Sequence, residues 1–81
     1  MLTRVRLMEV ISELIDHPLD EQSRSLPWPE LGVDSVNATE LLIHLEEALP
    51  TVDARGIEAA LYLSSTPNEL AARLAELGRA Q

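Results

Sequence analysis

The chain is 81 residues long and carries 14 acidic side chains against six arginines, so its formal net charge is −8. This charge argues against binding to nucleic acid or to an anionic membrane, because both are polyanions. With no cysteine and only two histidines, the sequence provides neither a disulfide nor the ligands of a thiolate-based or histidine-based metal site.

Hydrophobic residues make up 46% of the chain, which is too many for a disordered acidic tail. The longest aliphatic run is Leu41–Ile43, far shorter than the roughly 20 residues that span a membrane. The N-terminus also lacks the apolar stretch of a signal peptide. We therefore expect residues 1–81 to form one small globular domain in the cytoplasm.

The first predicted helix covers residues 3–16. Thr3 is a suitable N-cap, and Pro18 is expected to stop the helix. Five apolar residues fall on one helical stripe at the spacing i, i+1, i+4, i+7 and i+8: Leu7, Met8, Ile11, Leu14 and Ile15.

Residues 17–33 are predicted to be an irregular loop, because three prolines interrupt any regular pattern. A loop this long is usually functional or held by its own side chains. We expect Leu26, Trp28 or Leu31 to insert into the core. Trp28 is interpreted as a core residue, with direct contact to a ligand as the alternative.

The second predicted helix covers residues 35–49, between Asp34 as N-cap and Pro50 as a stop. Its apolar residues follow the spacing i, i+3, i+4, i+7 and i+11, which predicts a buried stripe of Ala38, Leu41, Leu42, Leu45 and Leu49.

Two further helices complete the pattern. Asp53 can cap a short helix that ends at about Leu61. Thr66 to Glu69 has the form of a capping box with proline at the first helical position. The last helix then carries an apolar stripe of Leu70, Leu74 and Leu77, and Gly78 is its expected stop. No strand pattern competes, so the sequence predicts an all-α bundle of three to four helices.

The other side of the second helix predicts a docking surface. Val36, Glu40, Ile43 and Glu47 are spaced i, i+4, i+7 and i+11 and lie nearly opposite the buried stripe; we call these four residues the acidic-aliphatic face. Such a mixture suits a basic, partly apolar partner surface. The alternative is that these are ordinary scattered surface residues.

The negative charge is concentrated on the same part of the chain. Residues 30–58 hold seven acids and one arginine, whereas residues 59–81 hold two of each. A field of one sign accelerates encounter with cationic partners. The alternative is that the charge serves only solubility.

Ser35 stands at the first position of the second helix, where its hydroxyl should be exposed beside unpaired backbone N–H groups. Such a position favours a phosphate group, although serine is also ordinary at a helix start. A hydrolytic role is excluded, because His44 lies about 13 Å further along the helix and on its opposite side. Nothing in the sequence places His17 near Ser35. We expect no catalysis by this chain alone.

At these residues the sequence resembles the acyl carrier proteins, the phosphopantetheine-binding carrier family. The resemblance is carried by Leu31-Gly32-Val33-Asp34-Ser35-Val36, followed by Glu40-Leu41 and Leu45-Glu46-Glu47. The order of a first helix, a long loop, a serine-headed helix and two further helices also resembles this family. The length fits a free-standing carrier.

The resemblance implies a function for Ser35 and for its neighbours. Ser35 would be joined through a phosphodiester to 4′-phosphopantetheine, donated from coenzyme A by a phosphopantetheinyl transferase. The thiol of that arm would carry an acyl or aminoacyl group as a thioester. A ligase or acyltransferase would load it, and downstream synthases or acyltransferases would receive it. The family's partner-binding positions correspond to Asp34, Val36, Glu40, Ile43 and Glu47 of a carrier that is a monomer when free.

The departures from the family pattern bear on the pathway. Val36 replaces a leucine and Asn37 an often acidic residue, which favours polyketide or mixed polyketide–peptide biosynthesis over fatty-acid synthesis. A fatty-acid carrier remains an alternative. Another is a D-alanyl-type aminoacyl carrier, which the stretch Thr66-Pro67-Asn68 resembles. From a different class, an unmodified acidic helical adaptor would use the acidic-aliphatic face with Ser35 as part of the cap.

Overall fold

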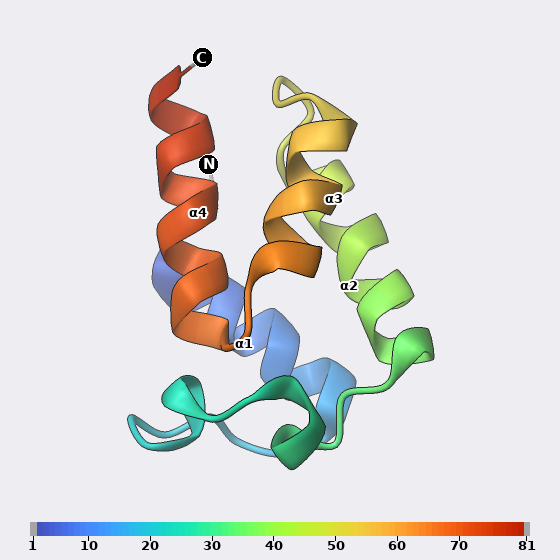
Figure 1. The fold of residues 1–81 in the computed structure, drawn as a ribbon, viewed down its shortest axis with the longest axis vertical. Helices are drawn as coiled ribbons and strands as arrows, with labels where there is room; N and C mark the ends of the chain where they lie inside the picture. Colours follow the sequence, from blue (N-terminus) through green and yellow to red (C-terminus); the bar gives the residue numbers. More distant parts are fainter. Residues whose placement is uncertain (1, 81) are drawn as a thin grey trace.

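The computed structural model describes residues 2–80, which form four α-helices and two short 3₁₀ helices without any strand (Figure 1). The α-helices are α1 (Arg4–Ile15), α2 (Ser35–Ala48), α3 (Ala54–Leu63) and α4 (Pro67–Ala80). The 3₁₀ helices η1 (Ser23–Ser25) and η2 (Trp28–Leu31) lie in the loop between α1 and α2. The predicted all-α helical bundle is therefore confirmed. In the described part of the chain, no helix is both long and apolar enough to cross a membrane.

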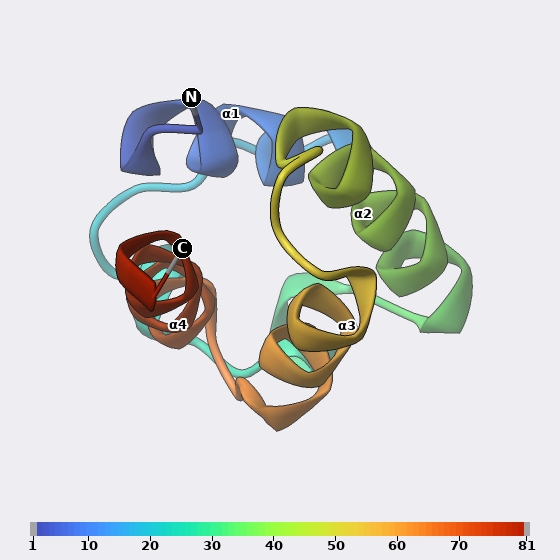
Figure 2. The ribbon, with the colours of Figure 1, turned by 90° about the horizontal axis from the view of Figure 1, so that it is seen from above.

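The four helices stand in a ring around the core when the molecule is viewed from above (Figure 2). Each helix contacts the next one along the chain, and α4 closes the ring against α1. The apolar stripes predicted for the helices point into this ring. The most deeply buried side chains are Leu7, Ile11, Leu45, Ile57, Leu70 and Pro67.

The predicted start of α1 is confirmed, and its end lies one residue before the predicted end at Asp16. The Thr3 side chain accepts a hydrogen bond of 3.1 Å from the Arg6 N–H, so Thr3 is the N-cap. Asp16 then adopts a left-handed conformation with φ 53°, and the helix ends at Ile15.

The loop between α1 and α2 is more regular than predicted, because it contains η1 and η2. Leu19 is buried, and Trp28 and Leu31 pack against the core from a half-buried position. Leu26 is 37% exposed and does not insert. Trp28 is thus confirmed as a residue that holds the loop on the core.

Two details of the C-terminal half differ from the prediction. Helix α3 runs two residues beyond Leu61, and α4 continues through Gly78 to Ala80. Gly78 does not adopt the positive φ that ends many helices at glycine; among the described glycines only Gly32 does, with φ 78°. Glycine lowers helix propensity without forcing a stop.

The capping box of α4 is half confirmed. The Thr66 hydroxyl accepts a hydrogen bond of 3.2 Å from the Glu69 N–H, as predicted. The Glu69 carboxylate accepts its bond from the N–H of Ser65, at 2.8 Å, rather than from that of Thr66. The reciprocal contact is therefore displaced by one residue.

Candidate functional site

Ser35 is the first residue of α2, and its side chain is exposed. The chain reaches this position through Gly32, whose φ of 78° ends η2 and is readily adopted by glycine. The Asp34 side chain then caps α2 by accepting a hydrogen bond of 2.9 Å from the Asn37 N–H. The predicted N-cap of this helix is confirmed.

The start of α2 offers unpaired hydrogen-bond donors next to the serine. Among residues 2–80, the backbone N–H groups of Ser35 and Val36 donate no hydrogen bond. These donors and the dipole of the helix favour negative charge at this end. The surroundings of Ser35 therefore suit the phosphate group that the sequence suggested.

Asn37 ties the start of α2 to the end of α1. Its side-chain oxygen accepts a hydrogen bond of 3.2 Å from the Asp34 N–H, which completes a capping box. Its amide nitrogen donates one of 3.3 Å to the Leu14 carbonyl oxygen. An amide side chain can do both at once, because its oxygen accepts hydrogen bonds and its NH₂ group donates them. Sequence reasoning missed this role, although the spacing of an N-cap residue and a third helical residue could have indicated the box.

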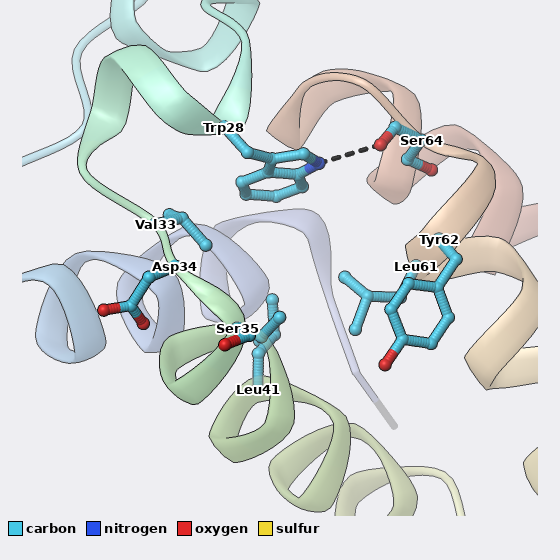
Figure 3. A pocket seen from close by; sticks show the side chains of 9 residues that line it. Trp28, Val33, Asp34, Ser35, Leu41, Leu61, Tyr62 and Ser64 are labelled. Carbon is cyan, nitrogen blue, oxygen red and sulfur yellow. Dashed lines mark hydrogen bonds between the residues drawn. The ribbon is translucent and has the colours of Figure 1, made fainter.

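An open cleft of about 200 Å³ lies between the start of α2 and the end of α3, with Ser35 at its edge (Figure 3). We call it the Ser35 cleft. The indole of Trp28 covers it from the loop, and its Nε1–H donates a hydrogen bond of 2.8 Å to the Ser64 carbonyl oxygen. The cleft is lined by Trp28, Val33, Asp34, Ser35, Ala38, Leu41, Leu61, Tyr62 and Ser64.

The sequence did not predict the residues that line this cleft on the side of α3. Leu61, Tyr62 and Ser64 come from the end of α3 and its C-cap, and no short-range pattern links them to Ser35. Trp28, interpreted as a core residue, is also a wall of the cleft. Packing against the core and lining the site are therefore compatible for this side chain.

The acidic-aliphatic face is exposed, as the helical spacing predicted. Val36 and Ile43 keep 62% and 53% of their surface exposed, and Glu40 and Glu47 are exposed beside them. The buried side of α2 carries Leu41 and Leu45 instead. Two large aliphatic side chains therefore face solvent among carboxylates.

Neither histidine belongs to the site. His44 is exposed on α2, and His17 follows α1 with its Nδ1 atom 2.8 Å from the Pro18 carbonyl oxygen. Neither side chain lines the Ser35 cleft. Within the described residues there is no group of three or more side chains suited to hold a metal ion. The cleft thus places no histidine next to the serine.

Comparison with protein families matches these features to one class. The family model described as the phosphopantetheine attachment site matches residues 5–74, which include the loop, Ser35 and the Ser35 cleft. The chain belongs to this family of carrier proteins. Comparisons with curated proteins and with solved structures gave no significant match.

Membership of the family establishes the general role of the chain. It carries covalently attached 4′-phosphopantetheine, and such domains are generally carriers rather than catalysts. They interact with a phosphopantetheinyl transferase and with biosynthetic enzymes.

Proposed function

We propose that Ser35 is the attachment point of the phosphopantetheine arm, and that residues 1–81 form a single carrier domain. The observation that carries the proposal is the exposed hydroxyl at the first position of α2, beside unpaired N–H groups and an open cleft. A serine walled in by neighbours would be closed to a transferase. The donor set also fits the group, because the N–H groups of Ser35 and Val36 can bind the phosphate oxygens.

The attachment uses the oxygen of Ser35 as the nucleophile. This oxygen bonds to the phosphorus that bears pantetheine in coenzyme A, the pyrophosphate P–O bond breaks, and 3′,5′-adenosine bisphosphate leaves. The transferase takes the hydroxyl proton, because no histidine of this chain lines the cleft. When bound, the arm supplies the thiol that forms thioesters, a group that a chain without cysteine lacks.

The acidic-aliphatic face, with Asp34 beside it, is the proposed docking surface for the transferase, the loading enzyme and the enzymes that use the cargo. Its exposed aliphatic side chains supply apolar contact area, and its carboxylates select cationic partners and speed their encounter. The free carrier is a cytoplasmic monomer in this proposal.

The cargo is proposed to be an acyl or aminoacyl group in polyketide or mixed polyketide–peptide biosynthesis. The support is that Val36 and Asn37 depart from the pattern of fatty-acid carriers. The resemblance to D-alanyl carriers at Thr66-Pro67-Asn68 has a structural explanation in this fold. Pro67 is buried, and Asn68 bonds to Ser25 and accepts a hydrogen bond from Arg4. These residues hold the start of α4 in place.

The test is the mass of the intact protein after incubation with coenzyme A and a promiscuous phosphopantetheinyl transferase. We expect the mass of one phosphopantetheine to be added, and fragmentation to locate it on the peptide that contains Ser35. A folded sample that gains no mass, or gains it at another residue, would contradict the proposal. The mass of the protein isolated from its native host would then identify the cargo.

A further inference from the structure

The side chain of Asn37 bonds to two elements at once. Its oxygen accepts a hydrogen bond of 3.2 Å from the Asp34 N–H, in the turn that leads into α2. Its amide nitrogen donates one of 3.3 Å to the carbonyl oxygen of Leu14, in the last turn of α1. Helix α1 contributes no residue to the Ser35 cleft. Asn37 therefore joins the turn before Ser35 to a helix that lies outside the site.

The Leu14 carbonyl oxygen depends on this bond. In a continuing helix it would accept from the residue four positions further on, which is Pro18 and has no N–H. The N–H of His17 donates to the Ser12 carbonyl oxygen instead. Among residues 2–80, the amide of Asn37 is the one group that donates to Leu14. The residue that prevents α1 from continuing thus also leaves free the acceptor that Asn37 uses.

The bond between Asn37 and Leu14 lies among apolar side chains. Both residues line a small cavity of about 10 Å³. Six of its seven lining residues have apolar or aromatic side chains; the other five beside Leu14 are Ile11, Ile15, Trp28, Val33 and Leu41. Shielding from water strengthens a hydrogen bond and makes an unpaired carbonyl costly. The bridge between α1 and α2 is therefore more than a surface contact.

The first turn of α2 has no buried side chain, and the first one in the helix is that of Leu41. Ser35 and the N-cap residue Asp34 are both exposed. Both hydrogen bonds of the capping box, at the N–H of Asp34 and at its carboxylate, are made with Asn37. The place of Ser35 relative to the core is therefore set by Asn37 and its bond to α1.

We propose that Asn37 is a positioning residue for arm attachment, which holds the Ser35 hydroxyl in the orientation that the transferase uses by tying Asp34 to Leu14. This rests on the proposed function, because it concerns the reaction of Ser35. Orientation of a nucleophile contributes strongly to the rate of a transfer. The proposal also gives a physical reason for the departure of Asn37 from the family pattern. A carboxylate could accept the bond from Asp34 but could not donate one to Leu14.

The experiment measures arm transfer in a single turnover, with the phosphopantetheinyl transferase in excess over the carrier and coenzyme A saturating. Intact mass gives the fraction of carrier that has gained the arm. The rate at saturating transferase reports the transfer step, and the transferase concentration that gives half of this rate reports docking. The two quantities separate the positioning of Ser35 from the binding of the partner.

Two variants separate the bridge to α1 from the capping box. Asn37→Ala removes both side-chain hydrogen bonds. Asn37→Asp has the same shape and keeps an oxygen for the Asp34 N–H, but at neutral pH it has no proton for the Leu14 carbonyl oxygen. For both variants we expect the saturating rate to fall several-fold, because the hydroxyl is no longer held in one orientation. The half-saturating concentration should not rise, because the acidic-aliphatic face is unchanged.

Asn68 provides the matched control, because it is the other asparagine of the chain and lies in the first turn of α4. Its amide donates a hydrogen bond of 3.1 Å to the Ser25 hydroxyl oxygen, and its oxygen accepts one from Arg4. Asn68→Ala and Asn68→Asp make the same changes of shape and charge at a residue that does not line the Ser35 cleft. They should leave the saturating rate unchanged. If Asn37 only stabilised the fold, its variants would behave in the same way.

The outcomes that would overturn the proposal are distinct. One is an unchanged saturating rate in both Asn37 variants when circular dichroism shows them folded. A loss in Asn37→Ala alone would assign the effect to the capping box and not to the bridge. A loss in Asn37→Asp alone, or one that added salt removes, would come from its charge. If Asn37→Ala does not fold, the rate of Asn37→Asp at high salt decides. An unaltered protein that gains no mass contradicts the proposed function instead.

Discussion

Helices α2 and α4 are both 14 residues long, and each begins at a side-chain cap that accepts a hydrogen bond from the backbone three residues further on. In α2 this pair is Asp34 and Asn37, and in α4 it is Thr66 and Glu69. The surroundings of the two starts differ. Ser35 is exposed beside an open cleft, whereas Pro67 is fully buried and Asn68 bonds to Ser25.

The comparison shows that a capped helix start does not by itself make an attachment site. Both starts have the dipole and the unsatisfied backbone groups of a helix end. Only the start of α2 combines an exposed hydroxyl with open space in front of it, because the loop holds Trp28 back against Ser64. The start of α4 instead contacts α1, η1 and α3 and holds these elements together.

The largest expected difference concerns arm attachment. Ser35→Ala should abolish the gain of mass completely, because it removes the proposed nucleophile. Ser65→Ala removes a second exposed serine, close to the start of α4, and should leave the gain intact. Intact mass after reaction with coenzyme A and transferase measures both. A mass gain retained in Ser35→Ala would remove the basis for assigning a role to the start of α2.

The next effect concerns stability, and here the larger change is expected at the start of α4 rather than at the start of α2. Leu70 in the first turn of α4 is fully buried, so Leu70→Ala should lower the free energy of unfolding by about 2–5 kcal/mol. Val36 in the first turn of α2 is largely exposed, so Val36→Ala should change it by less than about 0.5 kcal/mol. Urea denaturation followed by circular dichroism measures both. Similar losses for the two variants would show that Val36 is buried in solution.

Removing the two caps should separate stability from function. Asp34→Ala and Thr66→Ala should each cost about 1 kcal/mol in unfolding free energy, because each leaves one backbone N–H without its partner. Only Asp34→Ala should also slow transfer of the arm, since it loosens the turn that presents Ser35. Equal slowing by Thr66→Ala would mean that transfer follows overall stability rather than the local geometry of α2.

Charge reversal tests the acidic-aliphatic face. Glu40→Arg and Glu47→Arg should slow transfer of the arm several-fold at low ionic strength, and added salt should reduce the difference from the unaltered protein. Glu76→Arg makes the same change of charge on an exposed position of α4 and is the matched control. The measurement is the initial rate of arm transfer at two salt concentrations. Equal rates for all three variants would show that the net charge of the protein, rather than the acidic-aliphatic face, affects transfer.

The smallest effect involves Asp20, a loop residue away from both helix starts whose carboxylate accepts a backbone hydrogen bond. A hydrogen bond of 2.7 Å from the Ser23 N–H lowers the pKa of the Asp20 carboxyl below its ordinary value. The charged form is therefore favoured by folding, and its contribution to stability is present above the unfolded-state pKa of about 4. It is lost as the pH falls through the lower folded-state pKa.

The prediction for Asp20→Asn follows from this sign. The difference in unfolding free energy between the unaltered protein and the variant should be constant from pH 7 to about pH 5. It should decrease towards zero as the pH falls below about 4. Thermal unfolding at a series of pH values measures this difference. Arm transfer at neutral pH should not change, because Asp20 is remote in sequence from α2 and does not line the Ser35 cleft. A difference that widens at low pH would contradict the assigned direction of the pKa.

The sequence was a good guide to helices and a poorer one to their ends and to the loop. Capping residues placed the starts of all four α-helices, because a cap acts within three residues of itself. Gly78 was expected to end α4 and does not, because glycine ends a helix only where the chain turns left-handed. The 3₁₀ helices were missed, since prolines and unpatterned apolar residues predict no regular structure.

By itself, the sequence determined the serine at the helix start, the buried stripes and the acidic-aliphatic face, because contacts within one or two helical turns fix all of these. Only the tertiary structure decided that a cleft opens beside Ser35 and that Trp28 forms its wall. The bond from Trp28 to Ser64 joins residues 36 positions apart, and that from Asn37 to Leu14 joins residues 23 apart. No local periodicity encodes such pairs, since they form only when packing of the apolar stripes brings distant segments together.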